Sequence, residues 1–271
     1  MTRSFDPVTD LAAAAELPGV AQAAANARTR VDELLFDRAL RPKAVELAAD
    51  VALGNAHAST AMDGVEIPIT AWLSGDALDD SAMGRVAAGV WRLETKLRDL
   101  VPVWSTAPLQ ALAQMHTLVA SDVATPDELG RPRSTDDAED PLRLRSLVPA
   151  DEVPPALAVL ARMTQINSAK VPAVVEAAVV HGELLRLRPF RLGSGPVARG
   201  AGRLVMSQRG LDPDLLLMND AATFSIGRPG YVDAARGYIS GEPDGVARWL
   251  RFVAESVAVG ARMSSEQLHQ L

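Results

Sequence analysis

The sequence has no cysteine among its 271 residues, and aromatic residues make up only 4% of it. The first absence excludes disulfides and thiolate metal sites. The second disfavours an all-β fold, because strands are enriched in aromatic residues. The chain also lacks an uninterrupted apolar run long enough to span a bilayer. Its first residues, M-T-R-S-F-D-P, lack the apolar core of a secretory signal. We therefore expect a cytoplasmic protein that does not associate with membranes.

The residues that are abundant point to a folded, acidic protein. Apolar residues account for 48% of the chain, which excludes a disordered polypeptide. The formal net charge of −7 disfavours a nucleic-acid partner. The four histidines show no metal-ligand spacing, so no metal site is predicted.

Apolar residues recur at helical spacing along most of the chain, which predicts a mainly α-helical, all-α fold. Residues 121–155 differ, because they are rich in Pro, Asp and Arg and have little periodicity. This segment should form loops with at most a short β-hairpin. The predicted helices cover residues 20–40, 42–57, 79–100, 108–119, 155–167, 171–187, 197–208, 231–239 and 245–263.

Residues 187–199, L-R-P-F-R-L-G-S-G-P-V-A-R, resemble the signature of the Fic (filamentation-induced-by-cAMP) family, H-P-F-x-[DE]-G-N-G-R-x-x-R. The residues that match the framework of this motif are Pro189, Phe190, Gly193, Gly195 and Arg199. The residues that replace its reacting groups are Arg188 for His, Leu192 for the acidic residue, Ser194 for Asn and Pro196 for the first Arg.

Other segments resemble the same family in the same order. The helix before the signature carries His181, and H-T-L-V followed by E-L-G-R-P-R resembles the lead-in to the flap, a hairpin that aligns the target peptide. Arg131 and Arg133 would lie at this flap. Arg248-Trp249-Leu250 with Phe252 resembles the closing helix. The resemblance implies a Fic-like domain at residues 101–271 and an N-terminal helical segment at residues 1–100.

Residues 58–64, A-S-T-A-M-D-G, resemble the inhibitory motif [ST]-x-x-x-E-[GN] of the family. Ser59, Asp63 and Gly64 would take its defined positions. The resemblance implies that the Asp63 carboxylate pairs with Arg199, which otherwise holds the nucleotide γ-phosphate. The alternative is a helix that ends at Gly64 and leaves Asp63 solvated.

The family transfers AMP from ATP to a protein hydroxyl, and this chemistry needs a base, a cation at the phosphates and donors for the developing charge. Arg188 cannot act as a base, because its guanidinium stays protonated. Leu192 offers no oxygen ligand for magnesium, and Pro196 offers neither charge nor a backbone N–H. We therefore predict no catalytic residue, and magnesium is not expected.

An anion-binding framework survives these replacements. Gly193, Ser194 and Gly195 lie just before a predicted helix and can aim backbone N–H groups at an anion. Arg199 and Arg203 are four residues apart and share a helix face. ATP or another phosphate ligand could bind there directly. The alternative is that arginines of this region, namely Arg186, Arg191 and Arg203, pair with carboxylates.

Three hypotheses follow for the function. The first is an inactive Fic-domain protein of the adenylyltransferase family that binds a nucleotide, another phosphate ligand, or a protein partner along its flap. The second is a working nucleotidyl- or phosphoryl-transferase with rearranged groups. The third is a structural or interaction protein with a vestigial pocket. The sequence is also compatible with a homodimer. His181 should be a structural histidine, and the acidic run at residues 136–140 should be a solvated loop.

Overall fold

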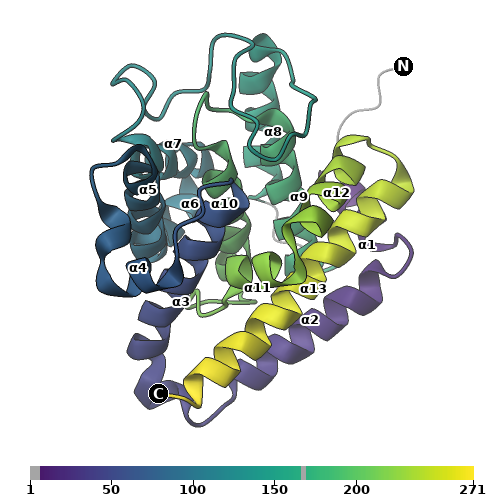
Figure 1. The fold of residues 1–271 in the computed structure, drawn as a ribbon. Helices are drawn as coiled ribbons and strands as arrows, with labels where there is room; N and C mark the ends of the chain where they lie inside the picture. The colour runs from purple at the N-terminus through teal and green to yellow at the C-terminus, as the bar shows by residue number, and fades with distance from the viewer. Residues whose placement is uncertain (1–6, 166–168) are drawn as a thin grey trace.

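The computed structural model describes residues 7–165 and 169–271. Within these ranges the regular structure is helical, without a β-strand, which confirms the predicted all-α fold. No helix in the described ranges is long and apolar enough to cross a membrane. The α-helices, labelled in Figure 1, are α1 (Pro7–Ala15), α2 (Val20–Leu35), α3 (Leu40–Met62), α4 (Ile69–Ser74), α5 (Ala82–Lys96), α6 (Val101–Thr106), α7 (Pro108–Ala120), α8 (Val153–Met163), α9 (Ala173–Leu187), α10 (Ser194–Gln208), α11 (Asn219–Ile226), α12 (Arg228–Ile239) and α13 (Pro243–Leu268). Short 3₁₀ turns cover Asp76–Leu78, Leu97–Leu100 and Ala150–Glu152.

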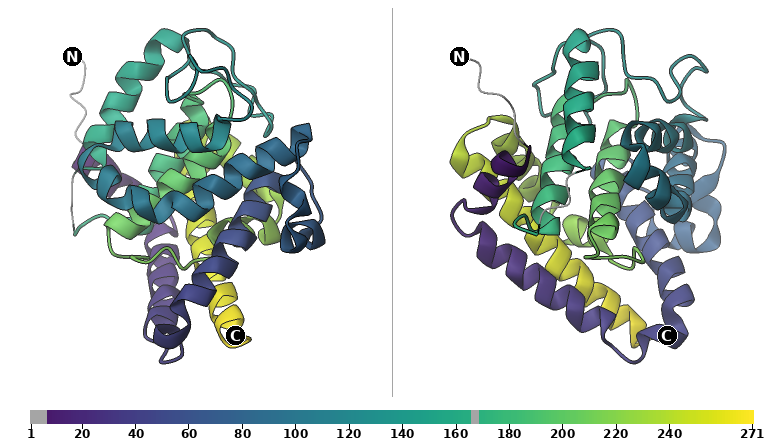
Figure 2. Two further views of the ribbon diagram at one scale, coloured as in Figure 1. Left: turned by 90° about the vertical axis from the view of Figure 1, so that its left-hand side faces the viewer. Right: turned by 180° about the vertical axis from the view of Figure 1, so that it is seen from behind.

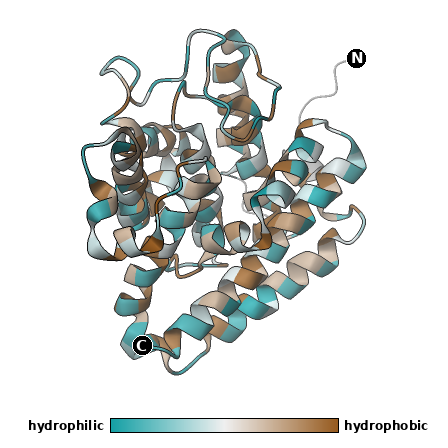
Figure 3. Cartoon of the chain, in the orientation of Figure 1, coloured by the Kyte–Doolittle hydropathy of each residue, from teal (hydrophilic) through white to brown (hydrophobic). Residues whose placement is uncertain are grey.

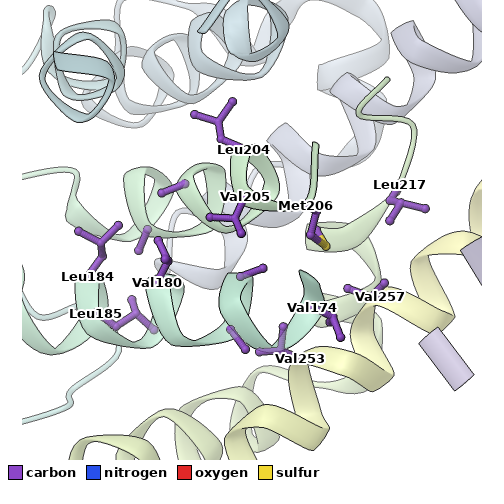
Figure 4. Close-up of a cluster of buried hydrophobic side chains, with 14 of the residues drawn as sticks. Val174, Val180, Leu184, Leu185, Leu204, Val205, Met206, Leu217, Val253 and Val257 are labelled. Carbon is purple, nitrogen blue, oxygen red and sulfur yellow. The ribbon is translucent and has the colours of Figure 1, made fainter. Parts of the chain in front are cut away.

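Helices α9 and α10 form the centre of the molecule and pack along one another (Figure 4). Their facing side chains are aliphatic, and α13 contributes Val253 and Val257 from the other side of α9. Gly182 lets aromatic rings approach α9 closely, because a Cβ there would lie 2.7 Å from the Tyr238 ring and 2.8 Å from Trp249 Nε1. This dense packing fixes the two helices that flank the signature.

Helix α2 lies along α13 on the outside of the molecule, as Figures 1 and 2 show. Its buried residues recur at steps of three and four, and its other face is mostly hydrophilic (Figure 3). Helices α2 and α13 both contribute to one hydrophobic core, whose residues extend from Leu11 to Leu268. The N-terminal segment therefore shares its core with the rest of the chain.

The long segment between α7 and α8 contains no hairpin. Its backbone groups form hydrogen bonds within local turns, with the signature loop and with side chains. The N–H of Arg133 donates to the Pro189 carbonyl at 2.8 Å, and the N–H of Glu139 donates to the Arg191 carbonyl at 2.9 Å. The carboxylate of Asp136 accepts from the Ala150 N–H at 2.7 Å.

Several helix ends differ from the predicted ones. Helix α2 ends at Leu35 instead of residue 40, because the Asp37 carboxylate accepts the Ala39 N–H at 2.8 Å and starts a new turn. Helix α3 continues to Met62, past the predicted residue 57, and α13 continues to Leu268. Helices α1, α4, α6 and α11 were not predicted. Residues 166 and 167 of the predicted 155–167 helix, and the N-terminal residues 1–6, lie outside the described residues.

Candidate functional site

The signature loop connects α9 to α10 in a fixed conformation. Arg188 ends α9 at a left-handed φ of 39°, and Gly193 precedes α10 at a φ of 71°. A Cβ on Gly193 would lie 2.8 Å from Val119, so glycine is needed for both the backbone and the space. Phe190 is buried and stacks on His116, with the ring centroids 4.0 Å apart. The Ser194 hydroxyl closes the loop by bonding the Phe190 N–H and carbonyl.

Asp63 and Arg199 form the contact expected from the inhibitory motif. The Arg199 guanidinium donates to both carboxylate oxygens, with Nη2–Oδ2 at 2.7 Å and Nη1–Oδ1 at 3.1 Å. Ser59, one turn earlier, accepts from Arg199 Nε through its hydroxyl at 2.8 Å and from Nη2 through its carbonyl at 3.0 Å. A Cβ at Gly195 would lie 2.5 Å from Asp63, so glycine makes room for this carboxylate.

The end of α3 explains how the shorter aspartate reaches Arg199. Asp63 directly follows the last helical residue, and Gly64 turns the chain away at a φ of 86°. The predicted helix stop at Gly64 therefore occurs, yet the Asp63 side chain is only 13% exposed. The solvated alternative for Asp63 is wrong. The inhibitory role itself stays a prediction.

Arg199 and its partners form part of a buried charge cluster. Burial alone would lower the pKa of the Arg199 guanidinium, but Asp63, Tyr231 and Asp220 together outweigh burial, so the pKa is raised. Asp220 on α11 is buried, and its Oδ2 lies 4.0 Å from Arg199 Nε. Burial raises the pKa of the Asp220 carboxyl. Neither oxygen of this carboxyl has a hydrogen-bond partner among the described residues.

Arg203 faces a different carboxylate from Arg199. It pairs with Glu94 of α5, and both side chains are buried. Burial raises the pKa of the Glu94 carboxyl, although Arg203 opposes this shift. The two arginines on one face of α10 therefore connect this helix to α3 and to α5.

Arg188, at the position of the family histidine, holds the neighbouring loop. Its Nη1 lies 3.2 Å from Asp140 Oδ1, and its Nη2 donates to the Ser146 carbonyl. The side chain is only 6% exposed. A buried, permanently charged group at this position forms part of the structure and cannot accept a proton.

The two predicted flap arginines lie in different environments. Arg133 is buried and donates to the carbonyls of Thr135, Val148, Leu187 and Arg188. Arg131 is exposed. Arg133 therefore fixes the 121–149 segment to the end of α9, and Arg131 remains accessible.

The acidic run is a loop in which Asp136 and Asp137 are exposed, as predicted, but two of its carboxylates also contact the signature loop. The Glu139 carboxylate accepts the Gly193 N–H, and Asp140 pairs with Arg188. The remaining cavity, lined by Asp63, Glu139 and Ser194, has a volume of about 10 Å³. Such a volume holds about one water molecule. Carboxylates of the chain itself thus occupy the space around the predicted anion site.

The other arginines near the signature are also paired. Arg191 pairs with Glu128, and Arg186 pairs with Glu183 at 2.8 Å. The alternative in which these arginines and Arg203 pair with carboxylates is therefore observed. The predicted anion-binding roles of Gly193, Ser194, Gly195, Arg199 and Arg203 stay predictions.

Two histidines near the loop are buried. His181 Nε2 bonds the Tyr231 hydroxyl at 2.9 Å, and burial lowers the pKa of this histidine to about 3. His116 Nδ1 accepts the Gly130 N–H at 2.9 Å, and burial lowers its pKa to about 4. Both rings are therefore neutral at neutral pH. Within the described residues, no group of three or more His, Asp or Glu side chains is placed to hold a metal ion.

Three solved structures are similar to this chain in fold. A Fic family protein from Desulfovibrio desulfuricans aligns with a TM-score of 0.69 and 18% identity, over 92% of this chain and 76% of that one. A fragment of Fic-1 from C. elegans aligns at 0.70 and 18%, over 93% and 73% of the two chains. A variant of that fragment aligns at 0.73 and 17%, over 92% and 72%. No family model and no curated protein matches the sequence.

The structural likeness confirms the fold that the signature predicted: this chain has the fold of Fic family proteins. At this low identity the likeness establishes the fold alone, and function depends on the residues of the site.

Several carboxylates of the site were not predicted as site residues from the sequence. Glu94, Asp140 and Asp220 provide carboxylates to the signature region from α5, the 121–149 segment and α11. Asp140 belongs to the acidic run, so charge complementarity to the arginine-rich signature was an available signal. Glu94 and Asp220 carry no local signal, because their partners lie far away in the sequence.

Proposed function

We propose that this chain is a Fic-fold protein that does not transfer AMP and whose signature loop binds an anion of the phosphate type. The observation that carries the first part is the position of Arg188. It stands where the family has its histidine, and it is buried against Asp140 and the Ser146 carbonyl. With Leu192 in the acidic position, the site offers neither a base nor a hard oxygen ligand for magnesium.

The second part rests on the carboxylates that contact the loop. Asp63 engages Arg199 in a bidentate geometry, and Glu139 accepts the Gly193 N–H. Carboxylate and phosphate oxygens use the same donors, namely guanidinium groups and backbone N–H groups at helix starts. A phosphate ligand would replace these side chains, and it would bind without magnesium.

Labelled ATP tests the first part. With magnesium present, the parent and an Asp63→Ala variant should both show no self-modification, because the base and the metal ligand are absent in each. Strong labelling of the parent that disappears in Arg199→Ala would favour the hypothesis of a working transferase with rearranged groups.

Calorimetry with inorganic phosphate and with ATP tests the second part. Binding should be the same with and without magnesium, should weaken with added salt, and should be stronger in Asp63→Ala than in the parent. An Asp99→Ala variant, altered at an exposed carboxylate, serves as the matched control.

The small residual cavity and the ion pairs of Arg186, Arg191 and Arg203 favour one other candidate, a structural or interaction protein with a vestigial pocket. The absence of phosphate binding in both the parent and Asp63→Ala would support that candidate.

A further inference from the structure

Residues 136–146, here called the strap, cross the signature loop. The strap begins with the acidic run and continues through Leu142 and Leu144, which are buried although Arg143 and Arg145 are exposed. We propose that the strap is a latch that closes the signature loop through Glu139 and Asp140 and must open before an anion binds. This inference rests on the proposed anion-binding function, because it concerns access to the same site.

Glu139 connects the strap to the signature loop in two ways. Its carboxylate accepts the Gly193 N–H, and its own N–H donates to the Arg191 carbonyl at 2.9 Å. The Gly193 N–H immediately precedes α10, where a helix attracts negative charge. Glu139 therefore uses the same donor that an external anion would need.

Asp140 both shapes the strap and anchors it. Its two oxygens accept the N–H groups of Leu144 and Arg145, each at 2.8 Å. The same carboxylate lies 3.2 Å from Arg188 Nη1. Loss of this one side chain would therefore remove the internal turn and the contact to the signature loop together.

The closed strap is held in a strained backbone conformation. Arg143 and Arg145 adopt φ values of 53° and 67°, which residues with a side chain rarely do. Asp140 and two arginines of α12 oppose this strain: Arg228 donates to the Pro141 carbonyl and Arg236 to the Arg143 carbonyl, each at 2.7 Å. Opening would release the strain, so the closed state depends on these side-chain contacts.

Repulsion between carboxylates also acts against the closed state. Burial raises the pKa of the Glu139 carboxyl, and the neighbouring charge of Asp63 raises it further. The two side chains line the same cavity. An anion that entered without displacing them would meet both negative charges, so displacement of the strap has to accompany binding.

Measurements of strap opening at single residues test the proposed latch. In Glu139→Ala, in Asp140→Ala and in the double variant, amide hydrogen exchange at Gly193 and trypsin cleavage after Arg143 and Arg145 should accelerate by about tenfold or more, the scale for one lost charge-assisted bond. Asp137→Ala changes an exposed carboxylate of the same run and is the matched control. Exchange at Val180, buried in α9, should stay unchanged and so separate local opening from global unfolding. Unchanged cleavage and unchanged Gly193 exchange in the double variant would overturn the proposal.

Inorganic phosphate separates this inference from the proposed function. If both hold, phosphate accelerates cleavage of the parent strap, and Glu139→Ala binds phosphate more tightly than Asp137→Ala does. If phosphate binds to the parent and leaves cleavage unchanged, anion binding stands and the latch is refuted. If the variants open the strap and neither they nor the parent bind phosphate, the latch stands and the proposed function fails.

Discussion

Two of the interfaces between the N-terminal segment and the rest of the chain have opposite character. Helix α2 packs on α13, and the buried face of α2 is a periodic row of Val, Leu and Ala side chains. Helix α3 meets α10 through Ser59, Asp63 and Arg199. The first interface tolerates exchange of one apolar side chain for another, whereas the second requires defined groups at defined distances. Specific information about function is therefore concentrated in the second.

Helix α10 carries a second buried ion pair, between Arg203 and Glu94, in addition to the pair between Arg199 and Asp63. A buried ion pair adds little net stability, yet loss of one partner is costly because the other charge stays buried and unpaired. Apolar truncation costs lost burial and a cavity instead. The predictions below use this difference.

The largest effect is expected where the ionic pair is most buried. Glu94→Ala should lower the free energy of unfolding by about 4 kcal/mol, because the buried Arg203 side chain loses its ion-pair partner. Urea unfolding measures this change. The double variant Glu94→Met with Arg203→Leu should recover most of the loss, since apolar replacement of a buried pair is often neutral. A double variant as unstable as Glu94→Ala would refute the ionic explanation.

Truncation in the apolar interface should have a smaller effect. Leu34 on α2 is fully buried, so Leu34→Ala should cost about 3 kcal/mol in the same measurement. Leu34→Met should cost less than half of this, because volume is kept. Phe36→Ala, at a side chain that is 82% exposed, is the control and should be nearly neutral. Equal losses in Leu34→Met and Leu34→Ala would show that shape dominates over burial at this interface.

The helices around the signature could be predicted from the sequence, and the ionic contacts largely could not. Periodicity placed α5, α7 and α9 within a few residues, because long amphipathic helices repeat a signal over several turns. Helices α4 and α6 span only six residues each and provide too few turns for a pattern.

The Asp63–Arg199 contact was accessible only through the resemblance of two distant motifs. The Glu94–Arg203 pair had no such guide, because nothing local in α5 identifies a partner on α10. The role of Arg188 could be predicted only in part. Its charge excluded a role as catalytic base, but its contact with Asp140 depends on the path of the strap, whose sequence has no periodicity. Sequence therefore predicted which groups are absent from the site better than it predicted which groups fill it.

Lower pH should reduce the stability contributed by the site, whereas the stability contributed by the apolar interface should not change. The pKa of His116 is lowered to about 4 by burial, so between pH 6.5 and 4 the unfolded chain binds a proton that the folded chain does not. This histidine should therefore reduce stability by about 2 to 3 kcal/mol as the pH falls from 7 to 4.5, at about 1.4 kcal/mol per pKa unit. His116→Gln removes the titrating group and provides the reference. The loss on acidification should be larger in the parent than in His116→Gln, and the cost of Leu34→Ala should not change with pH.

The smallest stability change is expected for Asp63→Ala, although this substitution removes the contact with Arg199 that the inhibitory motif predicts. The Asp63 side chain is partly exposed, and Asp220 lies 4.0 Å from Arg199 as a second counter-ion. Rotation of the guanidinium toward Asp220 would limit the loss to about 2 kcal/mol, below the cost of Glu94→Ala. Combining Asp63→Ala with Asp220→Asn should cost more than the sum of the single changes, because both then leave Arg199 uncompensated. A purely additive double variant would show that Asp220 does not act as the substitute, and would leave Arg199 free for phosphate in Asp63→Ala alone.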